Sequence, residues 1–556
     1  MKLRKHQAEM LEVCTRIRNG GPVRDIYVLV TPGGGKSALP AIAGGVLIPG
    51  FAEALCWVAP RTALQRQGEE NFLDPRFRNL ISHNLTIRAS TNEPNPCRCE
   101  NGFITTYQAV GVDRGTLVEE FRRRRYILVT DEYHHAEEDS QWHAALAELV
   151  SLAVVRIYMT GTFERGNGKK IAFTPYRTVS SDLQYEISRP AVGESPTQAV
   201  IRYTRADALA EQAILPLRFE FFDGRVQWKT AATGRHEAVL SDVKKGKASA
   251  AIYTALNTDY AEDLLSRGFA HWANHKRRVP GASLLVVTSG IEQARRALEW
   301  LKRSWALAEI ATSHDSSAAH QAINNFRRGA LDVLATIAMA YEGMDCPSVS
   351  HIICLTHIRS TPWIEQMLAR AVRIDPDAGP YETQEAHIFA PDDALMRAVC
   401  ARIEAEQAPV VRKKKVTEEE QLGLFGDGGC ADEITPLGGE IIGARGFAIG
   451  RRPRGFAPPL PMTPSDIEAD LRQKIEAHVR GYSQANYYKP QRINGEIRKV
   501  FGKSRPEMDR RELAACLSHV KRAYPASGPA VTCSESKPRQ YPRLFPTKPV
   551  PWRPNR

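Results

Sequence analysis

Long apolar runs are missing from this chain of 556 residues, because no stretch approaches the 18 consecutive apolar residues of a membrane-spanning helix. The first ten residues, MKLRKHQAEM, have no apolar core after their basic residues, so we expect no signal peptide. The ten cysteines are scattered; only Cys97 and Cys99 are close together, a spacing that does not favour a zinc site. We therefore expect a cytoplasmic protein with reduced thiols and no contact with membranes.

Acidic residues are fewer than basic ones, which leaves a net charge of +12 and an isoelectric point near 9.2. This balance favours a polyanionic partner such as nucleic acid, although charge alone is also compatible with a merely basic soluble protein. A hydrophobic content of 43% is sufficient for ordinary globular cores. At this length we expect about three or four domains.

A glycine-rich stretch, TPGGGKS at residues 31–37, follows a short apolar run and precedes a helix-compatible one. Strand, glycine loop, Lys-Ser and helix form the layout of a phosphate-binding loop. Glycines let the backbone N–H groups approach phosphate oxygens, the lysine reaches the β- and γ-phosphates, and the serine hydroxyl binds Mg²⁺. The candidate residues are Gly33, Gly34, Gly35, Lys36 and Ser37.

Four further strand-compatible runs alternate with helical stretches, which predicts a parallel sheet with helices on both faces. Ligands of such sheets bind at the carboxyl ends of the strands. An acidic pair, Asp131 and Glu132, follows the run at residues 126–130. Asp131 is suited to hold Mg²⁺, and Glu132 is suited to orient and deprotonate an attacking water molecule.

Five strings occur in a fixed order, each at a predicted strand end: TPGGGKS, APRT, ITTYQ, DEYH and TGT. This order resembles superfamily 2 helicases, most nearly the DExH branch that includes the motor subunits of restriction enzymes. The later strings ATSHD, FRRG, DVLAT, YEGMDCP and QMLARAVR resemble motifs IV to VI of the same family. The family usually carries glycine where Ala369 stands, and alanine is still small enough for close packing.

The resemblance implies an α/β protein in which two tandem RecA-like domains bind ATP and Mg²⁺ between them. Gln7 would contact the adenine edge, and Gly343 and Asp345 would complete the nucleotide site. Arg370 and Arg373, expected on one helix face together with Gln366, would sense the γ-phosphate and act in catalysis with Glu132. Nucleic-acid contacts are implied for Arg61, Thr62, Thr105 and Thr106, and coupling of nucleotide state to movement for His134, Thr160 and Thr162.

The expected domains are residues 1–165 (ATP binding), 166–250 (a connecting segment), 251–407 (second RecA-like domain), 408–462 (a flexible linker), 463–524 (a basic helical module) and 525–556 (a disordered tail). A hairpin is expected around Asp223-Gly224. The second domain is expected to start with a long helix over residues 254–272. In the module, a capping box at residues 465–468 would begin the first helix, and Tyr482, Tyr487 and Tyr488 could stack on bases.

The resemblance therefore predicts an ATP-dependent DNA helicase with backbone contacts and little sequence preference. A translocase that does not separate strands, an RNA helicase and a non-catalytic scaffold remain as alternatives. The C-terminal module could bind DNA or dock a protein partner. It resembles small helical modules at the ends of phage-encoded DNA proteins.

Overall fold

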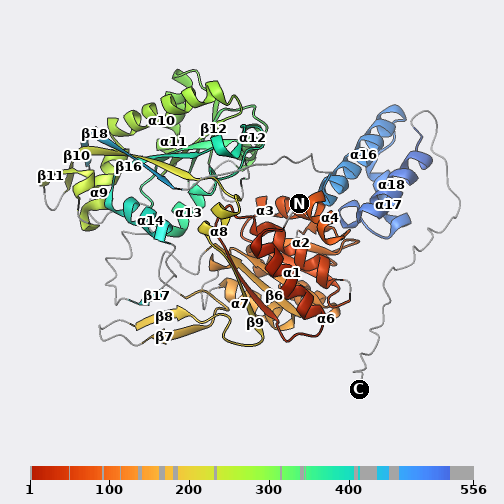
Figure 1. Cartoon of the computed structure of the whole chain (residues 1–556). Helices are drawn as coiled ribbons and strands as arrows, with labels where there is room; N and C mark the ends of the chain where they lie inside the picture. The colour runs from red at the N-terminus through yellow and green to blue at the C-terminus, as the bar shows by residue number, and fades with distance from the viewer. Residues whose placement is uncertain are drawn as a thin grey trace. The chain divides into compact units, whose positions relative to one another are not determined.

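The computed structural model contains two compact units, Met1–Pro461 and Met462–Arg556 (Figure 1). The first unit holds two large sheets and one small one. The described residues are 3–48, 50–90, 93–112, 114–135, 141–161, 170–179, 186–230, 234–243, 245–312, 316–337, 344, 346–405, 411–413, 435–449 and 462–525. No helix within these ranges has both the length and the apolar content needed to cross a membrane.

The first sheet is entirely parallel, with strand order β3-β4-β2-β5-β6-β1-β9. Its strands are β1 (Asp25–Val30), β2 (Ala54–Ala59), β3 (Ile87–Ala89), β4 (Gly102–Thr106), β5 (Tyr126–Asp131), β6 (Val155–Thr160) and β9 (Gln198–Tyr203). The helices among them are α1 (Lys5–Arg18), α2 (Leu39–Leu47), α3 (Ala63–Leu73), α4 (Pro75–Ile81), α5 (Tyr107–Val112), α6 (Arg114–Arg123), α7 (Gln141–Leu152) and α8 (Arg205–Ala210).

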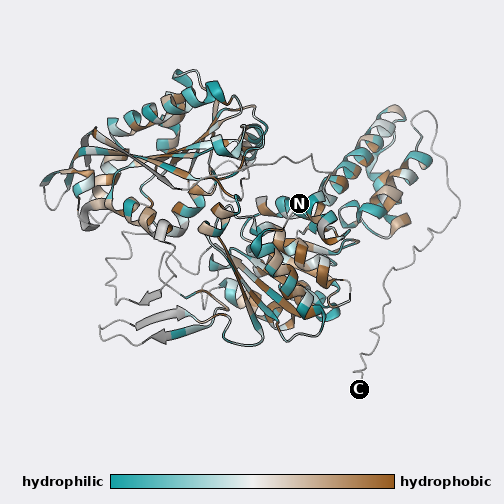
Figure 2. Ribbon diagram, in the orientation of Figure 1, coloured by the Kyte–Doolittle hydropathy of each residue, from teal (hydrophilic) through white to brown (hydrophobic). Residues whose placement is uncertain are grey.

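Helices cover both faces of this sheet because successive side chains of each strand point to opposite faces. Leu55 and Trp57 of β2 pack into a core shared with α1 and α2, whereas Cys56 and Val58 pack into a second core with α6 and α7. Figure 2 shows apolar residues along the strands and on the helices beside them. The doubly covered parallel sheet predicted from the alternating pattern is confirmed.

The second sheet has the order β11-β10-β16-β15-β12-β14-β13, and β18 pairs with β10. All of its pairs are parallel except β10 with β11 and β10 with β18. Its strands are β10 (Leu217–Thr230), β11 (Gly234–Val239), β12 (Ser283–Thr288), β13 (Ala308–Ala311), β14 (Val333–Ile337), β15 (Val349–Leu355), β16 (Ala386–Pro391) and β18 (Thr435–Ile449). Its helices are α9 (Lys245–Leu256), α10 (Asp259–Arg278), α11 (Ile291–Arg303), α12 (Ser316–Arg327), α13 (Thr361–Leu368) and α14 (Ala394–Ala405).

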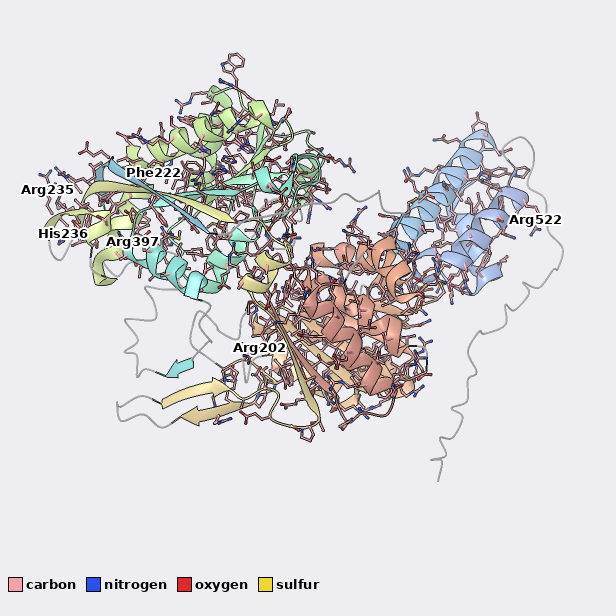
Figure 3. The ribbon with its side chains drawn as sticks, viewed as in Figure 1. Arg202, Phe222, Arg235, His236, Arg397 and Arg522 are labelled. Carbon is pink, nitrogen blue, oxygen red and sulfur yellow. The ribbon has the colours of Figure 1, made fainter. Side chains whose placement is uncertain are left out.

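Side-chain contacts fix α14 to this part of the chain. Arg397 donates a hydrogen bond to the carbonyl oxygen of Ser241 at 2.7 Å and lies 3.1 Å from a carboxylate oxygen of Asp392. Figure 3 labels Arg397 together with Phe222 of β10 among the side chains of this unit. These contacts connect α14 to the short turn after β11.

The hairpin expected around Asp223-Gly224 is wrong, because β10 runs without a turn from Leu217 to Thr230. Only a local register shift against β18 occurs at Asp223 and Gly224. A Cβ atom on Gly224 would lie 2.5 Å from Cε2 of Tyr260, so glycine serves close packing there instead of a turn.

The segment expected to connect the two domains is largely built into their sheets. β9 is the edge strand next to β1, and β10 and β11 belong to the second sheet. A small antiparallel sheet, β17-β8-β7, is formed by Val411–Lys413, Glu186–Pro190 and Tyr176–Val179. The helix expected over residues 254–272 is two helices, α9 and α10, which separate at Asn257-Thr258.

The stretch of residues 408–462 was expected to be a flexible linker, yet it contains β18, which pairs antiparallel with β10 from Leu217 to Lys229. Dense glycine in this stretch indicates a loop from composition alone. One glycine is required by packing, since a Cβ atom on Gly439 would lie 2.5 Å from Oγ1 of Thr258.

The second unit is a bundle of three helices, α16 (Pro464–Ala485), α17 (Pro490–Phe501) and α18 (Arg510–Ala523). Its core includes Ile475, Val479, Ile493 and Leu513. The first helix begins after Thr463, whose side chain accepts the N–H of Asp466, so the capping box expected at residues 465–468 is wrong.

One of the tyrosines expected to stack on bases is not accessible. Tyr482 is 4% exposed and packs in the core of the bundle, where its ring meets that of Tyr524 edge-on. Tyr487, by contrast, is 99% exposed. Tyr488 packs against Tyr482 and has the guanidinium of Arg492 over its ring.

Candidate nucleotide site

The glycine loop between β1 and α2 has the backbone conformation that only glycine adopts easily. Gly33 and Gly35 have φ angles of +86° and +92°, in the left-handed region. A short 3₁₀ turn over Lys36–Ala38 then leads into α2. Ser37 lies in this turn, and its carbonyl oxygen accepts a hydrogen bond from the side chain of Asn71 at 3.1 Å.

The acidic pair lies where β5 ends. In the same parallel sheet, β6 separates β5 from β1, the strand that leads into the glycine loop. The backbone N–H of Glu132 donates to Oδ1 of Asp131 at 2.9 Å, and Glu132 has a left-handed φ of +47°. The hydroxyl of Tyr107 donates to the carbonyl oxygen of Asp131 at 2.9 Å. Such strain in a residue other than glycine is typical of functional positions.

Lys36 connects the loop to this acidic pair. Its Nζ lies 3.2 Å from Oδ1 of Asp131 and contacts Oε1 of Glu132. Burial by itself lowers the pKa of Lys36, but the two carboxylates outweigh it and raise the pKa. The ammonium therefore stays charged.

Two carboxylates share this single ammonium in a buried place. Burial raises the pKa of Asp131; the charge of Lys36 opposes the rise and that of Glu132 adds to it. The excess of one negative charge, next to the hydroxyl-bearing Ser37, is an environment that suits a divalent cation with oxygen ligands. The charge of this acidic pair thus fits a divalent cation, for which Asp131 and Ser37 would be the ligands that the sequence resemblance implies.

His134 links the acidic pair to the end of β6. Its Nδ1 lies 2.9 Å from Oγ1 of Thr160 and 3.4 Å from Oε2 of Glu132. One imidazole therefore lies between Glu132 and Thr160. Thr162, the other residue expected to couple, lies outside the described residues.

Arg370 and Arg373 were expected on one face of a helix, and this is wrong, because α13 ends at Leu368. The chain beyond it is a series of tight turns, with the N–H of Arg370 bonded to the carbonyl of Met367. Nη1 of Arg370 donates to the carbonyl oxygen of Met344 at 2.8 Å. Gln366 lies in the last turn of α13 and is partly buried.

The turns after α13 nevertheless lie against the glycine loop. A Cβ atom on Gly33 would be 3.0 Å from Cγ2 of Val372 and 3.8 Å from the carbonyl oxygen of Ala369. The carbonyl of Val372 also accepts the N–H of Leu215 at 2.8 Å. The segment from the second sheet that carries the two candidate arginines is therefore adjacent to the loop of the first sheet.

One arginine at the loop was not identified from the sequence. Nη1 of Arg4 donates to the carbonyl oxygen of Gly34 at 2.9 Å. Burial lowers the pKa of Arg4, and the neighbouring charges of Arg76 and Arg373 lower it further, while Tyr203 and Glu211 oppose them. The guanidinium of Arg4 thus lies at a loop suited to phosphate, and the only signal for Arg4 in the sequence is its place three residues before Gln7.

Other candidate residues differ in how accessible they are. Oε1 of Gln7 accepts the backbone N–H of Arg4 at 3.1 Å, and its side chain is buried. Thr105 is buried, and Oγ1 of Thr106 accepts the N–H of Ala109 at the start of α5, so neither presents its hydroxyl at the surface. Arg61 and Thr62, at the end of β2, are at least partly exposed. Gly343 and Asp345 lie outside the described residues.

Similar proteins were found among protein families, curated proteins and solved structures. Residues 1–165 match the family of the type III restriction enzyme res subunit, and residues 265–375 match the helicase conserved C-terminal domain. An uncharacterized protein of Mycobacterium leprae is 24% identical over 70% of this chain and 62% of its own length, and an uncharacterized protein of Mycobacterium tuberculosis gives the same figures. The chain thus spans about three fifths of the length of these relatives.

Two solved structures show similarity at low sequence identity. The ATP-dependent type ISP restriction-modification enzyme LlaBIII bound to DNA is 14% identical, with a TM-score of 0.43 over 70% of this chain and 28% of that one. Mycobacterium smegmatis helicase Lhr bound to single-stranded DNA and AMP-PNP is also 14% identical, with a TM-score of 0.45 over 73% of this chain and 49% of that one. Together with the glycine loop, the acidic pair and the two sheets, the two family matches in this order support a superfamily 2 helicase with a motor of the restriction-enzyme type.

Proposed function

We propose that the protein hydrolyses Mg·ATP in a DNA-stimulated reaction and couples it to movement along DNA and separation of its strands. The observation that carries this proposal is the contact of Lys36 with both Asp131 and Glu132 beside a left-handed glycine loop. The matched helicase families support the coarser part, a nucleic-acid motor.

In this proposal each residue has a separate role. The loop N–H groups and Lys36 bind the triphosphate, and Ser37 and Asp131 hold Mg²⁺, which supplies neutralisation of phosphate charge. When phosphate oxygens replace the carboxylates as partners of Lys36, Glu132 is released to accept a proton from the attacking water. His134 keeps Glu132 connected to Thr160.

Arg370 and Arg373 are proposed to contact the γ-phosphate from the second domain. The adjacency of Val372 to Gly33 supports this role, because it brings the segment to the loop. Guanidiniums of this kind contribute about 10³–10⁵ in rate in related reactions. Gain and loss of that contact in each cycle would drive relative movement of the two domains.

The first experiment measures ATP hydrolysis with single-stranded DNA, duplex DNA, RNA or no polymer. We expect stimulation by DNA in the wild-type protein, loss of the stimulated rate in Lys36→Ala and Glu132→Gln, and a rate reduced by about 10³ or more in Arg373→Ala. Arg373→Lys keeps the charge but loses the planar fork, so it should restore little.

Matched controls are Lys302→Ala and Arg303→Lys, which alter exposed residues at the end of α11. Wild-type turnover in Lys36→Ala or Glu132→Gln would contradict the assigned site. If only RNA stimulated ATP hydrolysis, the proposed substrate would be RNA and not DNA. A strand-displacement assay then separates a helicase from a translocase, since only the helicase releases the displaced strand.

A further inference from the structure

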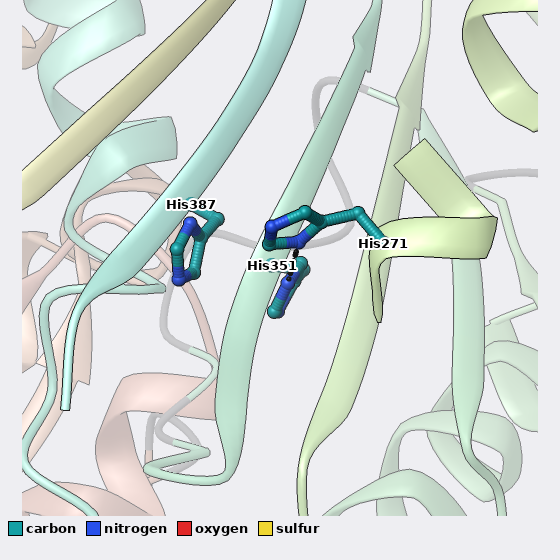
Figure 4. Close-up of side chains that lie close together, drawn as sticks. All are labelled: His271, His351 and His387. Atoms are coloured by element: carbon teal, nitrogen blue, oxygen red, sulfur yellow. Dashed lines mark hydrogen bonds between the residues drawn. The ribbon is translucent and has the colours of Figure 1, made fainter. Parts of the chain in front are cut away.

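Four histidines from three elements gather at one face of the second sheet (Figure 4 shows three of them). His271 and His275 are one turn apart on α10, and the ring of each lies near that of His351. His351 of β15 and His387 of β16 are direct partners in the parallel ladder. A helix that presents two histidines four residues apart over two adjacent strand histidines is an arrangement seen in metal sites.

The nitrogen atoms of three of these residues face one another. Nδ1 of His271 is 2.9 Å from Nε2 of His351, and one nitrogen from each of His271, His351 and His387 lies within 4.8 Å of the others. Among the described residues, these form the group of three or more His, Cys, Asp or Glu side chains whose ligand atoms lie close enough together to hold one metal ion. The rings of His351 and His387 are stacked with centroids 4.7 Å apart.

Ordinary core packing leaves one feature of this cluster without an explanation. His387 is 8% exposed, and its Nδ1 has no hydrogen-bond partner among the described residues. A buried polar atom without a partner is unfavourable by about 1–3 kcal/mol. A cation that accepts its lone pair would remove this penalty, whereas stacking of the rings does not.

The surroundings favour imidazole as a ligand. Nδ1 of His351 lies 2.8 Å from Oγ of Ser350, and donation to that hydroxyl would leave the Nε2 lone pair directed toward His271. Burial, together with neighbouring histidines and arginines, lowers the pKa of His387 to about 3, so the ring is neutral at physiological pH. Neutral imidazole is the form that binds metals.

We propose that His271, His351 and His387 bind a divalent transition-metal ion of the zinc type, with His275 or water as the fourth ligand. Zn–N distances of about 2.0–2.1 Å in a tetrahedron require nitrogens about 3.3 Å apart. The 2.9 Å pair must therefore open slightly and the wider pairs must close. His271 is exposed on its helix, so its side chain can make that adjustment and the ion can enter from solvent.

The ion would fasten α10 to β15 and β16 and so stabilise the second sheet. No residue of the glycine loop or the acidic pair belongs to this histidine cluster, so the proposed metal site is separate from the proposed ATPase site. Imidazole ligands suit Zn²⁺, Co²⁺, Ni²⁺ and Cu²⁺ and do not suit Mg²⁺, which prefers oxygen.

The test titrates the full chain, dialysed against chelator and free of nucleotide, with Co²⁺ and then Zn²⁺. We expect one equivalent of Co²⁺ to give the visible absorption of a tetrahedral nitrogen site, displacement by Zn²⁺, and a higher midpoint of thermal unfolding with Zn²⁺. His271→Gln should weaken binding at least about 100-fold and remove the thermal shift, since second-shell changes alone cost 10–100-fold.

The control is His320→Gln, which alters an exposed histidine of α12 and should bind like the wild type. His387→Gln provides a second ligand variant, and should it fail to fold, His271→Gln on the exposed helix face still decides. Absence of saturable binding, or binding by His271→Gln equal to that of the wild type, overturns the proposal.

Discussion

Glu365 in α13 is a carboxylate of the first unit whose pKa is strongly raised by its surroundings. Burial raises the pKa of Glu365 from 4.5 to about 7, and the charge of Arg205 only partly opposes this rise. Asp131 is also shifted upward by burial, but Lys36 is in contact with it. Glu365 is therefore the residue whose ionisation should be visible in stability.

The first prediction concerns pH. Between pH 4.5 and 7 folded Glu365 holds a proton that the unfolded chain has lost, so its stabilising effect is complete below 4.5 and disappears as the pH rises through 7. Between pH 5 and 7 this residue should lower the free energy of unfolding of the first unit by roughly 1.4 kcal/mol per pH unit, and above pH 7 the fall levels off at about 3 kcal/mol at most.

The measurement is chemical denaturation of the wild type and Glu365→Gln at several pH values between 5 and 8. Glu365→Gln should flatten the fall in stability over this range, and Glu382→Gln, which alters an exposed carboxylate, should not. Equal slopes for the wild type and Glu365→Gln would contradict the shifted pKa.

At this scale the sequence was sufficient to predict which of the candidate residues lie together. Gly33, Lys36 and Asp131 follow strands that the apolar pattern marks, and parallel topology then brings their strand ends to one edge. Arg4 and the burial of Tyr482 could not be anticipated, because a solvated arginine or tyrosine has the same local sequence as a packed one. Only the tertiary contacts distinguish them.

Single elements were less predictable than the sheets. Helix α13 was extended by five residues in the prediction, because residues 369–373 have good helix propensity, whereas the chain turns there to meet the glycine loop. Strand β18 was missed for the opposite reason: its glycines lower strand propensity, but β10 provides the partner. In both places tertiary contacts override local preference.

The second prediction tests the packing of β18. A Cβ atom on Gly439 would lie 2.5 Å from Oγ1 of Thr258 and 3.3 Å from Cγ1 of Val226, so Gly439→Val should lower stability by about 1–3 kcal/mol. Gly443→Ala in the same strand is the control, since its nearest neighbour would be Cβ of Asp223 at 3.9 Å.

Thermal or denaturant unfolding of both variants provides the measurement. Gly443→Ala should be neutral or slightly stabilising, because alanine restricts the unfolded chain. A strand that does not pair with β10 in solution would leave both variants equal to the wild type.

At the scale of the whole molecule, alternation of strands and helices was sufficient to predict the first, parallel sheet, and the family resemblance predicted the second, which also has antiparallel pairs at β10. The sequence did not predict which sheet each strand of residues 166–250 joins. A strand such as β9 or β10 has the same apolar pattern in either sheet. The second unit has its own core and a net basic composition, but Arg472, Lys474 and Arg480 each contact an acid one turn earlier. Fewer of its basic side chains are therefore unpaired than their number alone indicates.

The third prediction concerns this second unit. A chain that ends at Pro461 should retain basal ATP hydrolysis, because the glycine loop and acidic pair belong to the first unit. It should bind DNA more weakly, and the dependence of affinity on salt should be shallower, since fewer phosphate contacts release fewer counterions.

Fluorescence anisotropy with labelled single-stranded and duplex DNA at two salt concentrations measures the change. A useful comparison is Tyr487→Ala in the full chain, which removes the exposed ring without altering charge. Unchanged affinity of the shortened chain at low salt would exclude a role of the second unit in DNA binding.

The contact of Lys36 with Glu132 also bears on how tightly any nucleotide is held. An incoming triphosphate competes with a partner that the lysine already has, so the measured affinity is a difference between two ionic contacts. The apparent affinity for nucleotide would then be weak even where the contact of Lys36 with phosphate is strong. Release of the product would be favoured, because Glu132 can again pair with Lys36.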